Sequence, residues 1–242
     1  MASSLIKVLY EEGPCLAVWK PPGISTQSPP GIESLEARIK QFLREREQKP
    51  GNVYLGVPHR MDRPVSGVLV FAKHVRAARR LSKQFERREV QKIYWACVAG
   101  EVMPPSGTWT DTMRKVPYEP RAEIVEATVE GARTAVLHYR ALRQTALGSL
   151  LEVTLETGRM HQIRLQAATH GHPVLGDVQY GSSISFGTQH SDERSRTIAL
   201  HGRSLSFQHP MTRTPVTVIA PLPRDWLELN LSLEPADYID EQ

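Results

Sequence analysis

An acidic residue, Asp62, lies between two arginines, Arg60 and Arg63, in the stretch HRMDRPVSGVLVFAK. Neighbouring positive charge favours the ionised form of a carboxyl group, so we expect Asp62 to be an anion. The same residues could be a solvated cluster of surface ion pairs, which is the more common arrangement. However, the apolar run 68–72 that follows has the length and β-branching of a buried strand. Loops mounted on core strands often carry function, so Asp62 is a candidate site residue.

A second polar group lies in TGRMHQIR, residues 157–164. Gly158 is expected to open a helix that carries Arg159 and Arg164. Helix N-termini and arginines both favour anions, so this segment could bind phosphate or face a carboxylate. The alternative is that Arg164 only stabilises the fold.

Tyr94 and three histidines are further candidates. Tyr94 lies in KIYWACVAG, an expected strand, where a tyrosine is usually part of the core with its hydroxyl group hydrogen-bonded. The spacing of His161, His170 and His172 could suggest a metal site, but no carboxylate or thiol pattern accompanies it. Capping and ordinary hydrogen bonding explain these histidines better, so we expect no metal.

Several classes of activity find no support in the sequence. It contains no phosphate-binding loop of the Walker type and no GxGxxG dinucleotide motif, so we expect no nucleotide cofactor. Ser66 precedes Gly67 but lacks the strand–turn–helix setting of a nucleophilic serine. The two cysteines, Cys15 and Cys97, lie in apolar runs and are expected to be buried free thiols.

The overall composition is that of an ordinary globular protein. The chain has 242 residues, a net charge of +4 and a pI of about 9.1, a mildly basic balance that permits a polyanionic partner. No apolar run approaches the roughly 20 residues that cross a bilayer, and the N-terminus lacks the apolar core of a signal peptide. We therefore expect a soluble, cytoplasmic protein without a membrane partner.

Many strands with scattered helices, and no regular βαβ alternation, predict an α+β fold with a mixed, mostly antiparallel sheet. No linker divides the chain, so we expect one domain over 1–242 with a core at about 6–223. Helices are expected at 34–48, 75–89 and 161–170, with a short one at 224–229. Loops are expected at 103–121 and 181–196, and a loose end over the last dozen residues. Strands are expected at 5–10, 15–19, 68–72, 92–99, 134–142, 150–156, 200–207 and 216–219.

Together these stretches resemble the RluA branch of the RNA pseudouridine synthases. HRMDRPVSGVLVFAK resembles the catalytic motif of that family with its acid at Asp62, and KIYWACVAG resembles the second motif with its tyrosine at Tyr94. TGRMHQIRLQAATHGHPVLGDVQYG resembles the third motif with its arginine at Arg164. The segments LYEEGPCLAVWKPPGISTQSP and LHGRSLSFQHP match flanking elements, so the resemblance spans about 6–223. Small departures occur at Met61, Val65 and Gln166.

The resemblance implies the pseudouridine synthase fold and conversion of uridine in RNA to pseudouridine, with no cofactor. Asp62 would attack C1′ of the ribose, promote C1′–N1 cleavage through a glycal, or attack C6 of uracil, and the sequence does not choose among these routes. Arg164 would pair with Asp62, and Tyr94 would pack against the uracil and move a proton. The target nucleotide would leave the base stack to reach them.

The resemblance also implies an RNA partner, ribosomal or transfer RNA, and a monomer. We expect no separate S4-type RNA-binding domain of the kind that many relatives have. Two rival functions are a catalytically silent RNA-binding protein on the same fold and an acid-dependent hydrolase in which Asp177 would be the second acid. The basic face of the helix 75–89 could simply be solvated, which is the more common case, and it could contact RNA if it borders the site. Basic residues of the expected loop 103–121 could also contact phosphates, namely Arg114, Lys115 and Arg121. The candidates for RNA contacts are Arg60, Arg63, Arg76, Arg79, Arg80, Lys83, Arg159 and His161.

Overall fold

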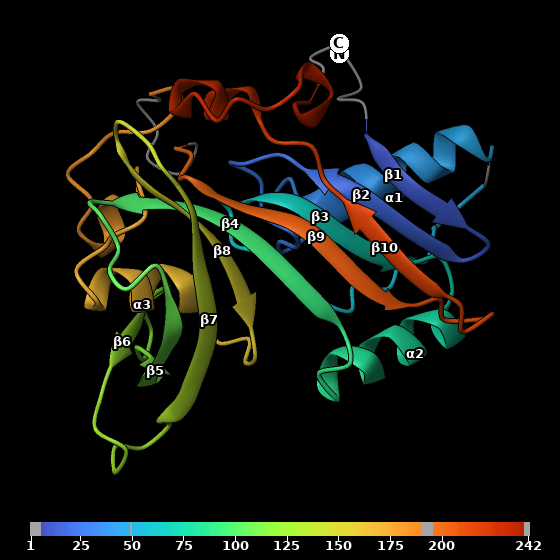
Figure 1. Ribbon diagram of the computed structural model, residues 1–242. Coiled ribbons are helices and arrows are strands. Elements are labelled where there is room, and N and C mark those ends of the chain that lie inside the picture. Colours follow the sequence, from blue (N-terminus) through green and yellow to red (C-terminus); the bar gives the residue numbers. More distant parts are fainter. Residues whose placement is uncertain (1–5, 49, 190–195, 240–242) are drawn as a thin grey trace.

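Strand β9, Leu200–Gln208, lies at the centre of the molecule, because three other strands pair with it. The structure is a computed structural model that describes residues 6–48, 50–189 and 196–239. Within these residues ten strands form one sheet in the order β1-β2-β3-β9-β4-β8-β7-β5-β6, and β10 also pairs with β9 (Figure 1). Of the strand pairs in this described part, only β3–β9 is parallel. The expected α+β fold with a mixed, mostly antiparallel sheet is therefore confirmed.

The strand and helix bounds agree with most of the expected elements. The helices are α1 (Leu35–Arg46), α2 (Val75–Glu86) and α3 (Gln162–Thr169), with short 3-10 helices at Val178–Tyr180, Arg224–Leu229 and Pro235–Asp237. None of the helices in the described ranges is long and apolar enough to span a bilayer. The remaining strands are β1 (Val8–Glu12), β2 (Cys15–Lys20), β3 (Ser66–Ala72), β4 (Gln91–Ala99), β5 (Ser106–Lys115), β6 (Ala122–Ile124), β7 (Arg133–Gln144), β8 (Gly148–Leu155) and β10 (Pro215–Ile219).

Strand β3 is buried on both faces, which explains its uninterrupted apolar sequence. Leu69 and Phe71 point to a core that also contains the buried face of α1, whereas Val68 and Val70 point to a second core covered by α2. The two helices thus lie on opposite sides of this part of the sheet (Figure 1). Such double coverage gives the loop before β3 a rigid support. Cys15 and Cys97 are buried free thiols, as expected.

Helix α3 packs against the other half of the sheet, beside β5, β6 and β7. Its Leu165 lies in a small core with Met113, Ala122 and Ala135. The fully buried Gln166 donates from Nε2 to the carbonyl oxygen of Trp109 at 3.1 Å and to Oδ2 of Asp111 at 2.7 Å. A buried amide with these partners fixes the helix against the sheet.

The expectation of a loop over 103–121 is wrong. Most of it is β5, which pairs with β7 from Ser106 to Met113, and short β6 follows at the edge. Trp109 and Met113 are buried while the threonines between them alternate outward, a period-2 pattern typical of a strand. The prolines and the glycine at 104–107 hid this pattern.

The expectation of a loose C-terminus is also wrong for residues 231–239. Leu231 and Ile239 are buried, and the backbone N–H of Ile239 donates to the carbonyl oxygen of Leu222 at 2.8 Å. The expected surface loop 181–196 carries a buried Phe186, whose ring meets Trp226 edge-on at 5.9 Å. Residues 190–195 of that loop and 240–242 of the C-terminus lie outside the described residues.

Two glycines bring β3 and β9 into close contact. Gly67 has φ +135°, and a Cβ atom there would lie 2.5 Å from the backbone nitrogen of Gly202. Gly202 pairs in turn with Tyr94 of β4. Strand β3, which follows the Asp62 loop, is therefore separated from Tyr94 of β4 by one strand, β9.

Candidate active site

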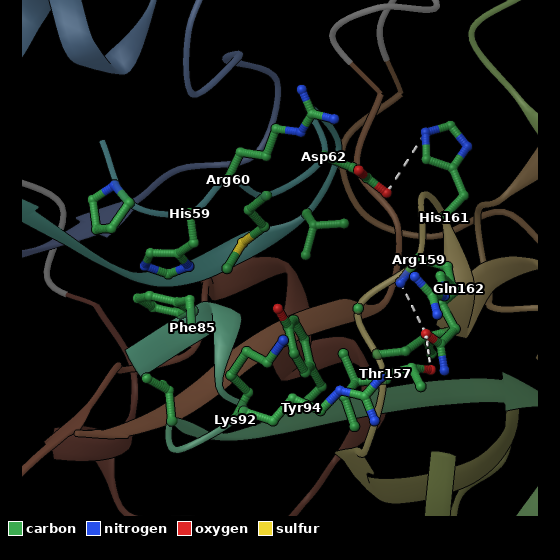
Figure 2. Close-up of a pocket in the computed structure, with 18 of the residues that line it drawn as sticks. His59, Arg60, Asp62, Phe85, Lys92, Tyr94, Thr157, Arg159, His161 and Gln162 are labelled. Carbon is green, nitrogen blue, oxygen red and sulfur yellow. Dashed lines mark hydrogen bonds and ion pairs between the residues drawn. The ribbon is translucent and has the colours of Figure 1, made fainter. Parts of the chain in front are cut away.

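A cavity of about 680 Å³ lies where the loop before β3, the middle of β4 and the turn before α3 meet (Figure 2). Its volume is in the range of sites that bind small ligands. Of the residues expected to form a site, Asp62, Tyr94, Arg164, Arg60, Arg159 and His161 line it. These six come from three segments that are far apart in the sequence.

Hydrogen bonds from two residues of the N-terminal segment, Thr26 and Lys20, hold the Asp62 loop. The hydroxyl group of Thr26 accepts from the backbone N–H of Met61 at 3.1 Å and donates to its carbonyl oxygen at 3.0 Å. The fully buried Lys20 donates from Nζ to the carbonyl oxygens of Val65 (2.6 Å), Pro21 (2.9 Å) and Arg63 (3.1 Å). Burial lowers the pKa of Lys20 to about 7, and the charge of Asp62 acts in the opposite direction. Three carbonyl acceptors around Nζ favour the ammonium form, which has three donors.

The Asp62 carboxylate faces two nitrogen atoms across the cavity. Its Oδ2 lies 3.6 Å from Nη1 of Arg164 and 3.7 Å from Nε2 of His161. These distances allow ion pairing but exceed hydrogen-bond length. Arg60 is exposed at the cavity wall, whereas Nε of Arg63 donates to Oγ of Ser25 at 3.1 Å and Arg63 does not line the cavity.

The strongest partner of Arg164 is Asp177. Nε of Arg164 donates to Oδ2 of Asp177 at 2.6 Å and Nη2 donates to Oδ1 at 2.8 Å, while Nη2 also donates to Gln179 at 2.8 Å. Burial acts against the charge of Arg164, but the hydrogen bonds and charge of Asp177 outweigh it and raise the pKa of Arg164. Arg164 is therefore both a structural residue and one whose Nη1 faces Asp62. Asp177 is buried in this pair, so it does not present a second free acid to the cavity.

Tyr94 and Lys92 point to the same side of β4 and both line the cavity. Burial, and then the charge of Asp62, raise the pKa of Tyr94, so its hydroxyl group stays protonated at neutral pH. Burial lowers the pKa of Lys92. Within the described part of the chain, no side-chain hydrogen bond or ion pair engages the Tyr94 hydroxyl or the Lys92 ammonium group. The sequence analysis missed Lys92, although its i, i+2 spacing from Tyr94 places it on the same face.

The helix expected from about His161 to His170 is confirmed, but the expectation that Gly158 opens it, with Arg159 in the helix, is wrong. Helix α3 begins at Gln162, and the side chain of Gln162 closes the turn by accepting from the hydroxyl group of Thr157 at 2.8 Å and from the backbone N–H of Arg159 at 3.0 Å. His161 has φ +53°, a left-handed conformation that costs a non-glycine residue roughly 1–3 kcal/mol and is often found at functional sites. Arg159 lines the cavity from this turn, outside the helix.

The basic residues of α2 lie away from the cavity. Arg76, Arg79 and Lys83 are exposed and do not line it, and Nη1 of Arg80 donates to the carbonyl oxygen of Pro210 at 2.7 Å. The end of this helix nevertheless reaches the cavity wall. Phe85 there stacks on His59 with ring centroids 4.3 Å apart, and Arg88 follows, a cavity cation that the sequence analysis missed. In the segment 103–123, Arg114 pairs with Glu123 and Arg121 pairs with Glu119.

The three histidines that could suggest a metal have separate partners. Nδ1 of His161 lies 2.8 Å from the hydroxyl group of Tyr180, Nε2 of His170 lies 3.1 Å from Asp111, and Nδ1 of His172 lies 3.0 Å from the carbonyl oxygen of Ala99. No cluster of three or more His, Cys, Asp or Glu side chains suited to a metal ion occurs in residues 6–48, 50–189 and 196–239.

Similarity to known proteins is extensive. A sequence model of the family described as RNA pseudouridylate synthase matches residues 15–169. Ribosomal large subunit pseudouridine synthase D of Xanthomonas campestris pv. campestris is 32% identical over 235 residues, covering 94% of this chain and 69% of that protein. tRNA pseudouridine synthase C of Haemophilus influenzae is 31% identical over 236 residues, covering 93% of this chain and 96% of that protein.

Two solved structures share the architecture. Human RNA pseudouridylate synthase domain containing 4 aligns with a TM-score of 0.75 at 21% identity, covering 94% of each chain. Human RNA pseudouridylate synthase domain containing 1 aligns with a TM-score of 0.69 at 24% identity, covering 92% of this chain and 85% of that one. At these identities the likeness shows a common fold.

Proposed function

The chain belongs to the RNA pseudouridylate synthase family, and we propose that the cavity around Asp62 is where it converts uridine in RNA to pseudouridine. It is an RNA pseudouridine synthase, an enzyme that isomerises a nucleotide already within an RNA chain. The observation that supports this cavity as the site is that Asp62, Tyr94 and Arg164, from three separate segments, all line it.

The reaction needs little more than a carboxylate and a proton donor. The C1′–N1 bond of uridine breaks, the uracil turns, and a C1′–C5 bond forms. C5 loses its proton and N1 gains one, so atoms balance and nothing is oxidised or reduced. Groups that stabilise charge near the ribose and move one proton are therefore sufficient.

Asp62 supplies the carboxylate. A carboxylate that attacks C1′ would divide one difficult displacement into two easier ones, while a glycal route and an attack on C6 remain alternatives. The shortest ion-pair contacts of Asp62 with His161 and Arg164 both involve Oδ2, so Oδ1 lies farther from these two groups. The arrangement thus favours Oδ1 as the oxygen atom available to the nucleotide.

Tyr94 supplies a ring and a protonated hydroxyl group. Its ring would pack against the uracil, as aromatic side chains do against flat ligands. Because the raised pKa keeps the hydroxyl group protonated, Tyr94 would act first as a hydrogen-bond donor or general acid.

The target nucleotide would turn out of its base stack to enter this cavity, at a cost of a few kcal/mol. Besides Arg164, four cations line the cavity and could bind the phosphates on either side of that nucleotide, namely Arg60, Arg88, Lys92 and Arg159. Binding of these phosphates would offset the cost of unstacking.

We propose ribosomal or transfer RNA as the substrate, since the similar proteins named above act on one or the other. We also propose that residues 1–242 form one catalytic domain that acts as a monomer in the cytoplasm. The rival, a silent RNA-binding protein, would not require Asp62, Tyr94 and Arg164 to line one cavity.

Deleting the gene and mapping pseudouridines by carbodiimide modification and primer extension across ribosomal and transfer RNA tests the function. We expect at least one pseudouridine to disappear and to return with the wild-type gene but not with Asp62→Asn. An unchanged map in the deletion strain would contradict the proposed function. Restoration by Asp62→Asn would contradict the assignment of the site.

A further inference from the structure

We propose that His161, which Tyr180 holds in the Nε2–H tautomer, is a positioning residue that donates to Oδ2 of Asp62 and leaves Oδ1 facing the nucleotide. This inference rests on the proposed function of the Asp62 cavity. It assigns a role to His161 that differs from RNA contact, and it assigns one to Tyr180, which the sequence analysis did not consider.

The hydrogen bonds around Tyr180 determine the tautomer of His161. The backbone N–H of Ala122 donates to the Tyr180 hydroxyl oxygen at 2.9 Å. That hydroxyl group has one proton and two possible acceptors, namely Nδ1 of His161 at 2.8 Å and the carbonyl oxygen of Ala122 at 3.5 Å. The shorter contact is much the stronger, so the proton points to Nδ1. A neutral imidazole whose Nδ1 accepts must have its own proton on Nε2.

The surroundings of His161 favour this neutral form. Burial lowers the pKa of His161, the charge of Asp62 acts to raise it and the charge of Arg164 acts to lower it. Among the described residues, Tyr180 and Asp177 are the other ionisable groups that interact with its ring. Burial also raises the pKa of Tyr180, which therefore keeps the proton that it donates.

Nε2 of His161 is directed at the same carboxylate oxygen that Arg164 faces. It lies 3.7 Å from Oδ2 of Asp62, and Nη1 of Arg164 lies 3.6 Å from that oxygen. Figure 2 shows the ring of His161 beside the Asp62 carboxylate, with a dashed line that marks their ion pair. Catalytic hydrogen bonds are often long before substrate binds and shorten in the complex, so a movement of roughly 1 Å or less would complete both.

Each of the two donors, Arg164 and His161, is itself held by another hydrogen-bonding partner. Asp177 holds Nε and Nη2 of Arg164, which leaves Nη1 for Asp62, and Tyr180 holds Nδ1 of His161, which leaves Nε2. The left-handed backbone at residue 161 turns the side chain toward the cavity. Such supporting contacts are what orients reactive groups in other sites. Two fixed donors on one oxygen would set the rotation of the carboxylate and thereby select which oxygen reacts.

Nitrogen NMR of the full-length enzyme labelled with 15N-histidine tests the tautomer directly. We expect His161, assigned by the loss of its signals in His161→Gln, to show an unprotonated Nδ1 and a protonated Nε2 at neutral pH. In Tyr180→Phe, which lacks the donor to Nδ1, we expect a mixture of tautomers. A protonated Nδ1 in the wild-type enzyme would overturn the proposal.

A pair of matched variants tests the donation to Asp62. The amide nitrogen of glutamine can occupy the place of Nε2, whereas asparagine, which tolerates the left-handed backbone better, is too short to reach Asp62. The assay measures release of tritium from RNA containing 5-tritiated uridine, because C5 loses its hydrogen on isomerisation. We expect His161→Asn to lower kcat about 10- to 100-fold with little change in KM, and His161→Gln to recover most of that loss.

The outcomes separate this inference from the proposed function. Equal kcat for His161→Asn and the wild-type enzyme, with Asp62→Asn inactive, would overturn the role of His161 alone. A rise in KM without a fall in kcat would also overturn it, since that result would indicate an RNA contact. Full activity of Asp62→Asn would instead overturn the assignment of the site.

Discussion

At the scale of single residues, the site combines charged groups that hydrogen bonds hold firmly with polar groups that have no side-chain hydrogen bond within the described residues. Arg164 is fixed by two hydrogen bonds to Asp177, and Lys20 is fixed by three carbonyl oxygens beneath the Asp62 loop. In contrast, no side-chain hydrogen bond engages the hydroxyl group of Tyr94 or the carboxylate of Asp62 within the described part of the chain. The groups available for chemistry are thus those that the fold leaves unsatisfied at a site open to a ligand.

Replacing Tyr94 by phenylalanine removes the proton donor and keeps the ring. We expect Tyr94→Phe to lower kcat by about 10²- to 10⁴-fold, the usual contribution of a general acid, while RNA affinity stays within a few-fold of the wild type. Single-turnover tritium release and filter binding on the same RNA measure the two quantities. A variant that loses affinity but keeps its rate at saturating enzyme would show that the hydroxyl group binds substrate and does not move a proton.

The residue types of the site could be predicted from the sequence, but most of their partners could not. Motifs point to Asp62, Tyr94 and Arg164, and all three line the cavity. The pairing of Arg164 with Asp177 was not expected, because a carboxylate thirteen residues away gives no periodic signal. The role of Lys20 was missed as well, because nothing in a local pattern shows that a lysine will be buried under a distant loop.

At the scale of elements, the site depends on the contact of β3, β9 and β4. Ser66 and Gly67 of β3 pair with His201 and Gly202 of β9, and Gly202 pairs with Tyr94 of β4. This short parallel contact fixes the Asp62 loop relative to Tyr94. The apolar run of β3 predicts the strand correctly, but the parallel partner 135 residues later could not be read from it, since strand pairing is set by the whole sheet.

A methyl group at Gly67 would test this contact. We expect Gly67→Ala to lower the free energy of unfolding by about 3 kcal/mol and to reduce kcat, because the new Cβ atom would meet the Gly202 backbone at 2.5 Å. Gly31→Ala is the matched control, since Gly31 also has a positive φ, +85°, but a Cβ atom there would have nothing within 4 Å. Its cost should be about 1 kcal/mol with activity unchanged. Equal losses in urea unfolding would show that the close approach does not matter.

The buried His201 is expected to make the stability of the β3–β9 contact depend on pH. Nδ1 of His201 accepts from the hydroxyl group of Ser66 at 2.8 Å and Nε2 donates to the carbonyl oxygen of Ala220 at 3.2 Å, and burial lowers the pKa of His201 to about 3. In the unfolded chain His201 binds a proton below about pH 6.5, whereas in the folded protein it stays neutral down to about pH 3. The contribution of neutral His201 to stability is therefore complete above pH 6.5 and is lost as the pH falls toward 3.

Urea unfolding between about pH 6 and pH 4 measures this effect. We expect the free energy of unfolding to fall more steeply in the wild type than in His201→Gln, by about 1.4 kcal/mol per pH unit. The variant has lower stability at pH 7 because it loses part of the hydrogen bonding, but the difference in slope is independent of that loss. Parallel pH profiles would mean that His201 is not held neutral in the folded protein.

At the scale of the whole molecule, the cavity is lined by more cations than anions, since five arginine and lysine residues line it against Asp62, Glu86 and Glu156. The net charge of +4 is small, yet Arg60, Arg88, Lys92 and Arg159 all line the cavity. The helical pattern of α2 allows its arginines to contact RNA, but a pattern shows only that they share a face and not what that face borders. RNA contact by α2 stays a prediction.

The salt dependence of RNA binding can show which of these charged residues contact phosphates. If Arg88 and Arg159 each contact a phosphate, the double variant Arg88→Gln with Arg159→Gln should reduce the slope of log Kobs against log salt by about 1.5. The comparison variant is Arg76→Gln with Arg79→Gln on α2. A decrease there would add α2 to the RNA footprint, and an unchanged slope in the cavity variant would contradict the phosphate contacts proposed for Arg88 and Arg159.

The central claim is that the carboxylate of Asp62 carries out isomerisation in this cavity. The most direct measurement is tritium release from RNA containing 5-tritiated uridine by the wild-type enzyme and by Asp62→Asn, with RNA affinity measured in parallel. We predict that the wild type releases tritium without free uracil, whereas Asp62→Asn has nearly the same shape, binds the RNA within about threefold and releases none above background. Release by Asp62→Asn at the wild-type rate would contradict this role of the carboxylate.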